Sequence, residues 1–278
     1  MAALFEIVPN ISEGRDRSVI DEAVAGVEAT GAKLLHRTSD PTHHRSVLTI
    51  AGTGDQCVAA SVALAEIAAK HIDLRTHRGV HPRIGALDVL PFVPLRDATM
   101  AQAVALAHEA GARIWERLRI PAFYYGQAAR NPKFRLLSQA RRGEFEALAT
   151  RADAPDTGDI RLHPSAGAIA IGARKILVAF NVVLASGNLQ IAKRIAAQIR
   201  ERNGGFRTLR ALGFQIDATH VQVSLNITDV YATPIALIVE TIRTLAAKDT
   251  IAIDHCELIG LLPRDAVSDV ARTTLGVS

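Results

Sequence analysis

Hydrophobic residues along this chain follow two spacings, and their succession predicts a mixture of helices and strands. Apolar positions three and four apart predict helices over residues 15–28, 55–71, 100–118, 189–202, 234–245 and 264–273. Short apolar or β-branched runs between turn residues predict strands over residues 4–8, 34–38, 46–50, 86–93, 122–124, 174–183, 208–213, 220–226 and 251–261. Residues 130–149 are mixed and basic, and are expected to form short helices and turns.

The connections between the predicted strands indicate the fold class. Strands 34–38 and 46–50 are joined by a polar turn, Asp-Pro-Thr-His-His-Arg at 40–45, which favours antiparallel neighbours. An apolar stretch over 168–181 bends at Gly172, and the order of elements then begins again. The pattern therefore predicts an α+β fold and not a doubly wound parallel sheet.

Composition limits the location of the protein. The 278 residues are 49% hydrophobic and 22% charged, as in soluble globular proteins. No apolar run approaches the roughly 18 residues of a membrane span, and the N-terminus lacks the features of a signal peptide. Cys57 and Cys256 have no metal-ligand spacing and are too few for a disulfide scaffold, so we expect a reducing cytoplasm.

The formal net charge of +4 admits two kinds of partner, nucleic acid or small anions. The basic residues are scattered, and aromatic residues make up only 4% of the chain, which leaves few platforms for base stacking. Small anionic molecules are therefore the favoured partners. Neither nucleic acid nor a membrane is expected.

The loop Thr-His-Arg-Gly-Val-His-Pro-Arg-Ile-Gly, residues 76–85, is the main candidate for chemistry. Pro82 disfavours a helical conformation at His81, and a non-helical imidazole among cations suits proton transfer near neutral pH. The alternative is a solvated basic loop. His77 lies four residues before His81, but Gly79 and Pro82 argue against the helix that a metal-binding pair would need, so no metal is expected.

Seven blocks in the chain resemble, in order, the glutamate formiminotransferase family. The central one is HRGVHPRIGALDVLPFVPL, residues 77–95. The others are VPNISEGRD (8–16), SDPTHHRSVLTIAG (39–52), PAFYYGQAA (121–129), RRGEFEAL (141–148), HPSAGAIAIGARKILVAFNV (163–182) and ELIGLLP (257–263). The chain departs from the family at His44, where asparagine is common, and at His36, where aspartate is common.

The resemblance implies a fold and an activity. We expect two α/β subdomains, 1–173 and a shortened 174–278, each a mainly antiparallel sheet with helices on one face and a groove between them. The family transfers a formimino group from N-formimino-L-glutamate to tetrahydrofolate, which is a co-substrate. The cyclodeaminase domain found in some relatives is absent from these residues.

The resemblance also implies roles for particular residues. His81 matches the catalytic histidine, which acts as acid and base. Asp88 or another carboxylate is a candidate for fixing its tautomer. Arg45 and Arg83 suit carboxylate binding because arginine holds carboxylates bidentately. The expected substrate and folate ligands are Asn10, His43, Arg45, Arg83, Gly158, His163, Pro164, Ser165 and Gly167.

Three other functions stay open at this point. One is a relative that uses formylglutamate or 5-formyltetrahydrofolate, and another is a folate-binding protein without turnover. A basic nucleic-acid binder is the third. The sequence does not fix the oligomeric state, and a homodimer is kept open.

Overall fold

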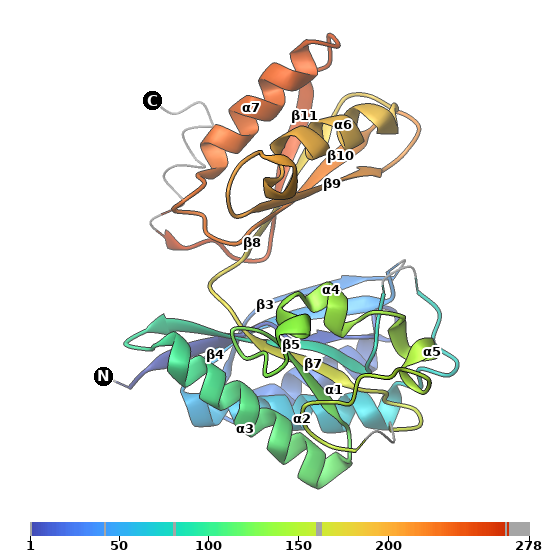
Figure 1. Cartoon of the computed structure of the whole chain (residues 1–278), viewed down its shortest axis with the longest axis vertical. Coiled ribbons are helices and arrows are strands. Elements are labelled where there is room, and N and C mark those ends of the chain that lie inside the picture. The colour runs from blue at the N-terminus through green and yellow to red at the C-terminus, as the bar shows by residue number, and fades with distance from the viewer. Residues whose placement is uncertain (1, 42, 80–81, 160–162, 265, 267–278) are drawn as a thin grey trace. The chain divides into compact units, whose positions relative to one another are not determined.

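The computed structural model describes residues 2–41, 43–79, 82–159, 163–264 and 266, and it contains two compact units (Figure 1). The first unit is Met1–Arg174 and the second is Lys175–Ser278. Each has a hydrophobic core of its own.

The first unit is built on a seven-stranded mixed sheet with the order β1-β4-β2-β5-β7-β6, and β3 pairs with β4. The pairs among β1 to β5 are antiparallel, whereas β7 runs parallel to both β5 and β6. The strands are β1 (Leu4–Ile7), β2 (Asn10–Ile11), β3 (Lys33–Asp40), β4 (Arg45–Gly52), β5 (Leu87–Arg96), β6 (Ala122–Gly126) and β7 (Ile169–Ala173).

Three long helices cover one face of this sheet: α1 (Arg17–Glu28), α2 (Gly54–His71) and α3 (Met100–Leu118). The last two begin with capping boxes, in which a threonine, Thr53 or Thr99, and the glutamine three residues later satisfy each other's backbone N–H groups. Their apolar stripes bury the main core against the sheet.

A second, smaller core lies on the opposite face, where Val89 and Phe123 of the sheet pack with Phe134 and Leu148. Its cover consists of η1 (Pro132–Arg135), α4 (Leu137–Ala140) and α5 (Glu144–Leu148). The expectation of helices on one face is therefore too simple for this unit. Parallel strands are normally buried on both faces. Accordingly, β6 and β7 are buried along almost their whole lengths, and β5 is buried except at its C-terminal end.

The second unit is a four-stranded antiparallel sheet with the order β11-β8-β10-β9. Alternate residues of β8, such as Val178, Phe180 and Val182, pack in a core with the helices. The elements are β8 (Val178–Leu184), α6 (Leu189–Ile199), η2 (Glu201–Asn203), β9 (Leu209–Gln215), β10 (Val221–Ile227), α7 (Ile235–Ala247) and β11 (Ile253–Ile259).

These two sheets confirm the predicted α+β class. Two details differ from the sequence-based expectation. Residues 168–183 form two strands, β7 and β8, and the strand expected from residue 174 begins at Val178. Asn10 and Ile11, which lie beyond the strand expected over residues 4–8, form a further short strand that pairs with β4 and β5. Most of the helix expected over 264–273 lies outside the described residues. Within the described ranges, no helix combines the length and apolarity needed to cross a membrane.

Candidate functional site

Three loops that are distant in sequence meet at one edge of the first unit. They are residues 12–14 after β2, the turn between β3 and β4, and residues 76–79. Gly14 and Gly79 each lie against the backbone of the turn between β3 and β4. A Cβ on Gly14 would lie 2.3 Å from the Asp40 carbonyl oxygen, and a Cβ on Gly79 would lie 2.6 Å from the His43 carbonyl oxygen, so only glycine permits these two contacts. The turn between β3 and β4 is therefore held between the other two loops.

A cluster of polar side chains lies beside this turn. The Arg45 guanidinium donates from Nε to Asn10 Oδ1 at 2.8 Å, and its Nη1 lies 3.4 Å from Asp88 Oδ2. Arg141 donates to the same oxygen of Asp88. The other oxygen, Oδ1, accepts the Ile84 N–H at 2.8 Å. Asp88 is thus a buried carboxylate shared by two arginines and a backbone amide.

A β-bulge places Asp88 in this position. On β2, Asn10 lies opposite Val89 and Ile11 lies opposite Leu87, so Asp88 is an extra residue on β5. Bulges of this kind redirect a side chain and are common beside active sites. Arg141 reaches the carboxylate from the C-terminal end of α4.

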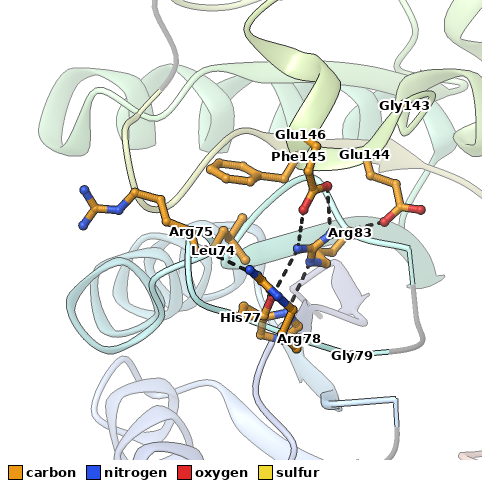
Figure 2. Close-up of a pocket in the computed structure, with 10 residues that line it drawn as sticks. All are labelled: Leu74, Arg75, His77, Arg78, Gly79, Arg83, Gly143, Glu144, Phe145 and Glu146. Carbon is orange, nitrogen blue, oxygen red and sulfur yellow. Dashed lines mark hydrogen bonds and ion pairs between the residues drawn. The ribbon is translucent and has the colours of Figure 1, made fainter.

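The second feature is an open pocket of about 730 Å³, shown in Figure 2. Arg83 lies at its base, where its guanidinium donates to Glu146 at 2.7 and 3.0 Å and to Glu144 at 3.2 Å. Arg75 and Arg78 line the same pocket, and the Arg78 guanidinium donates to backbone carbonyls. Figure 2 shows Arg83 between the two glutamates and His77.

His44 and His77 connect the arginine cluster to the pocket. Their rings stack with centroids 4.3 Å apart. His77 Nδ1 accepts from Arg83 Nε at 3.2 Å, so the proton of the neutral ring lies on Nε2, which donates to the His44 carbonyl at 3.3 Å. His44 Nδ1 accepts the Gly14 N–H at 3.1 Å. Burial lowers the pKa of both imidazoles, which keeps this stacked pair uncharged near neutral pH.

The segment 163–167 packs against the same region. The Ser165 carbonyl accepts the Leu74 N–H at 2.9 Å, and His163 Nδ1 accepts the Ala166 N–H at 3.0 Å. Gly167 has a φ of +69°, and a Cβ there would lie 2.2 Å from the Ile84 carbonyl oxygen. Burial lowers the pKa of the His163 imidazole. This segment therefore adjoins both Leu74 of the pocket and Ile84, whose N–H donates to Asp88.

Sequence models of one family match nearly the whole chain. The formiminotransferase domain, N-terminal subdomain, matches residues 4–174, and the formiminotransferase domain matches residues 179–275. The chain belongs to the formiminotransferase family. The resemblance drawn from the seven motifs is confirmed.

Relatives of this formiminotransferase chain come from several kingdoms. Glutamate formimidoyltransferase of Streptococcus pyogenes serotype M1 is 39% identical over 283 residues, which cover 100% of this chain and 95% of that protein. The enzyme of the same name from Thermoplasma acidophilum is 40% identical, over 97% of this chain and 91% of its own. Formimidoyltransferase-cyclodeaminase of Sus scrofa is 38% identical, over 98% of this chain and 52% of its own.

The site residues expected for a formiminotransferase fall into three groups. Asn10 and Arg45 are bonded to each other, and Arg83 lies at the base of the pocket. His43 is exposed and bonded to Asp40 at 2.7 Å, and Gly158 packs against Trp115, away from these clusters. His81 lies outside the described residues, whereas His163, Pro164, Ser165 and Gly167 form the segment described above.

Three residues of this candidate site were given no role from the sequence. Arg141 was noted only as part of a matching block, and Glu144 and Glu146 follow it in the same block. The sequence signal that could have indicated these residues is the succession of basic and acidic side chains in Arg-Arg-Gly-Glu-Phe-Glu, residues 141–146. Among the described residues, no group of three or more His, Cys, Asp or Glu could hold a metal ion.

Proposed function

We propose that this chain is a glutamate formimidoyltransferase, which moves a formimino group from N-formimino-L-glutamate to N5 of tetrahydrofolate. The observation that carries the proposal is the match to two enzymes of that name at 39% and 40% identity, over at least nine-tenths of each chain. The arginines that line the pocket and those that surround Asp88 in the first unit support it, since arginine binds carboxylates and both proposed substrates carry them.

The proposed reaction requires two proton transfers. The N5 amine attacks the formimino carbon and loses its proton, and a tetrahedral intermediate forms. The bond between that carbon and the glutamate nitrogen then breaks, and the departing amine gains a proton. His81 is proposed to accept the first proton and donate the second, because an imidazole can do both near neutral pH.

The assay for this function measures glutamate release from N-formimino-L-glutamate in the presence of tetrahydrofolate. Parallel reactions with N-formyl-L-glutamate identify the donor, and omission of the folate measures simple hydrolysis. Folate-dependent release from the formimino donor is expected. Release from the formyl donor alone, or folate binding without release from either donor, would overturn the proposal.

Replacement of Arg45 by alanine is expected to weaken substrate binding. A charge-assisted hydrogen bond contributes about 1.5–3 kcal/mol, so the KM of one substrate should rise about tenfold to a hundredfold, with a smaller change in kcat. Steady-state kinetics with each substrate varied in turn provide the measurement. Arg37→Ala is the matched control, because Arg37 is an exposed arginine of the neighbouring strand that pairs with Asp21. Unchanged KM values in Arg45→Ala would contradict a binding role.

Folate is proposed to bind against residues 158–167. Ligand binding suppresses local opening, so amide hydrogen exchange in this segment should slow when tetrahydrofolate is saturating. Peptides from 158–167 and from the control helix α1 (Arg17–Glu28) would be compared with and without ligand. Equal exchange in the 158–167 peptides, with ligand demonstrably bound, would remove this assignment.

The remaining binding and location assignments belong to the same proposal. The Arg83 guanidinium is engaged by Glu144 and Glu146, and its contact with substrate stays a prediction. A contact between His43 and substrate and the formation of a homodimer also stay predictions. A cytoplasmic location is supported by the free thiols of Cys57 and Cys256.

A further inference from the structure

His77 joins three segments of the first unit. It is 7% exposed, and its backbone N–H donates to the Asp73 carbonyl at 3.0 Å within its own turn. Its ring nitrogens form bonds outside that turn: Nδ1 accepts from Arg83 Nε at 3.2 Å, and Nε2 donates to the His44 carbonyl at 3.3 Å. One rigid ring therefore sets the spacing between Arg83, the loop 76–79 and the turn between β3 and β4.

His44 covers the His77 ring. The two rings stack with centroids 4.3 Å apart and 28° between their planes, and the His44 side chain is 13% exposed. The backbone of His44 has a φ of +50°, in the left-handed region where asparagine is among the enriched residues. Asparagine is common at this position in the family, so the turn itself does not require an imidazole. What histidine adds is a flat ring that shields the hydrogen bonds of His77 from water.

The hydrogen bonds of His77 require a neutral ring. A second proton would lie on Nδ1 and would face the N–H donor of the Arg83 cation. Burial is the largest cause that lowers the pKa of both His44 and His77, and Arg83 also lowers the pKa of His77. Glu13, whose carboxylate lies 3.4 Å from His44 Nδ1, acts in the opposite direction. The other charged side chains of the described segments that pack around the pair are Arg15, Asp40, Arg45, Asp73, Arg75, Arg78, Glu144 and Glu146. Burial and Arg83 outweigh Glu13, and so the pair is uncharged near neutral pH.

We propose that His77 is a positioning residue for the transfer reaction, whose neutral imidazole holds its loop against Arg83 and against the turn between β3 and β4, while His44 shields these hydrogen bonds. The inference rests on the proposed function, because the loop continues in the sequence to His81, the proposed acid and base, and the turn continues to Arg45. A misplacement of about 1 Å within such a site can cost about a hundredfold in rate. Both ring nitrogens of His77 are bonded within the protein, so its role differs from proton transfer.

Two replacements of His77 separate its hydrogen bond from its bulk. Asparagine Oδ1 branches from Cγ as Nδ1 of histidine does, so His77→Asn can still accept from Arg83 Nε, whereas His77→Leu fills the space without an acceptor. We expect His77→Leu to lower the kcat of glutamate release about tenfold to a hundredfold, and His77→Asn to cause a clearly smaller loss. His255→Leu, the same replacement at an exposed histidine of β11, is the matched control and should equal the wild type. Wild-type kcat in His77→Leu, or equal losses in the two His77 variants, would overturn the positioning role.

His44→Asn tests the shielding role. Asparagine suits the left-handed backbone and can accept the Gly14 N–H in place of His44 Nδ1, but it has no ring to cover His77. Loss of the cover should make local opening easier, so amide hydrogen exchange in peptides from residues 73–79 is expected to be faster than in the wild type. Peptides from α6 in the second unit should be unchanged. Equal exchange across 73–79 in the variant and the wild type would overturn the shielding role.

A spectroscopic measurement separates this inference from the proposed reaction. Long-range proton–nitrogen correlation spectra of histidine rings distinguish the two neutral tautomers from the charged ring, and they need no substrate. At about pH 7, the His77 ring is expected to be neutral with its proton on Nε2, and its signals are assigned by their loss in His77→Asn. Failure of the wild type to release glutamate, with this tautomer present, would count against the proposed function alone. A proton on Nδ1 of His77, or a charged ring, would overturn the inference.

Discussion

Replacement of His81 by alanine is expected to lower formimino transfer by about 10²- to 10⁴-fold, the range typical for loss of a general acid and base. The expectation comes from the His-Pro-Arg motif at 81–83 and from the two proton transfers that the reaction requires. The measurement is glutamate release from N-formimino-L-glutamate with saturating tetrahydrofolate. The acidic limb of the pH profile of kcat/KM in the wild type should be absent from the variant.

His255→Ala is a suitable control, because His255 lies exposed on β11 of the second unit and pairs only with nearby carboxylates among the described residues. It should retain wild-type transfer. Folate binding and thermal unfolding should be nearly unchanged in His81→Ala if the residue acts in chemistry. Near-wild-type turnover in a folded His81→Ala protein would remove the acid and base assignment, and His77 and His43 would be the next residues to test.

Replacement of Asp88 by alanine is expected to lower the free energy of unfolding of the first unit by about 3–5 kcal/mol. This is the usual cost of removing one partner from a buried ion pair, because the remaining charge stays buried without compensation. Here Arg45 and Arg141 would both lose their shared carboxylate, and the Ile84 N–H would lose its acceptor. The loss should exceed that from any surface ion pair in the unit.

Trp115 makes this measurement specific to the first unit. It is the single tryptophan of the chain and lies in α3, so its fluorescence in urea reports unfolding of that unit. Asp21→Ala is the matched control: it also removes an arginine-paired aspartate, but from the surface, and should cost no more than about 1 kcal/mol. A loss in Asp88→Ala as small as that in Asp21→Ala would show that the buried cluster contributes little to stability.

Local sequence determined most of the secondary structure. Helices α2 and α3 follow from the helical spacing of their apolar residues. Each begins directly after a threonine that forms a capping box with the glutamine three residues later. The β3–β4 hairpin follows from two apolar runs around a polar turn. These signals depend on residues only a few positions apart, and so they can be read without the fold.

The sequence also determined the family, because seven blocks in the same order are far more specific than any one of them. That resemblance selected His81, Arg45 and the segment 163–167 as candidates. It did not supply the partners of those residues. Gly158 illustrates the difference: its motif suggested a ligand contact, which stays a prediction, and only the structure gives its φ of +105° and its packing on Trp115.

Only the tertiary structure determined the arginine cluster. Asp88 is separated from Arg45 by 43 residues and from Arg141 by 53, and no local spacing relates them. A bulge opposite Asn10 and Ile11 places Asp88 at the start of β5, and the packing of α4 over the sheet brings Arg141 to the same carboxylate. The sequence specifies that these charges exist, but charge pairing over such distances is decided by which strands become neighbours. Strand pairing depends in turn on burying both faces of the sheet at once, which is a property of the folded unit and not of any segment within it.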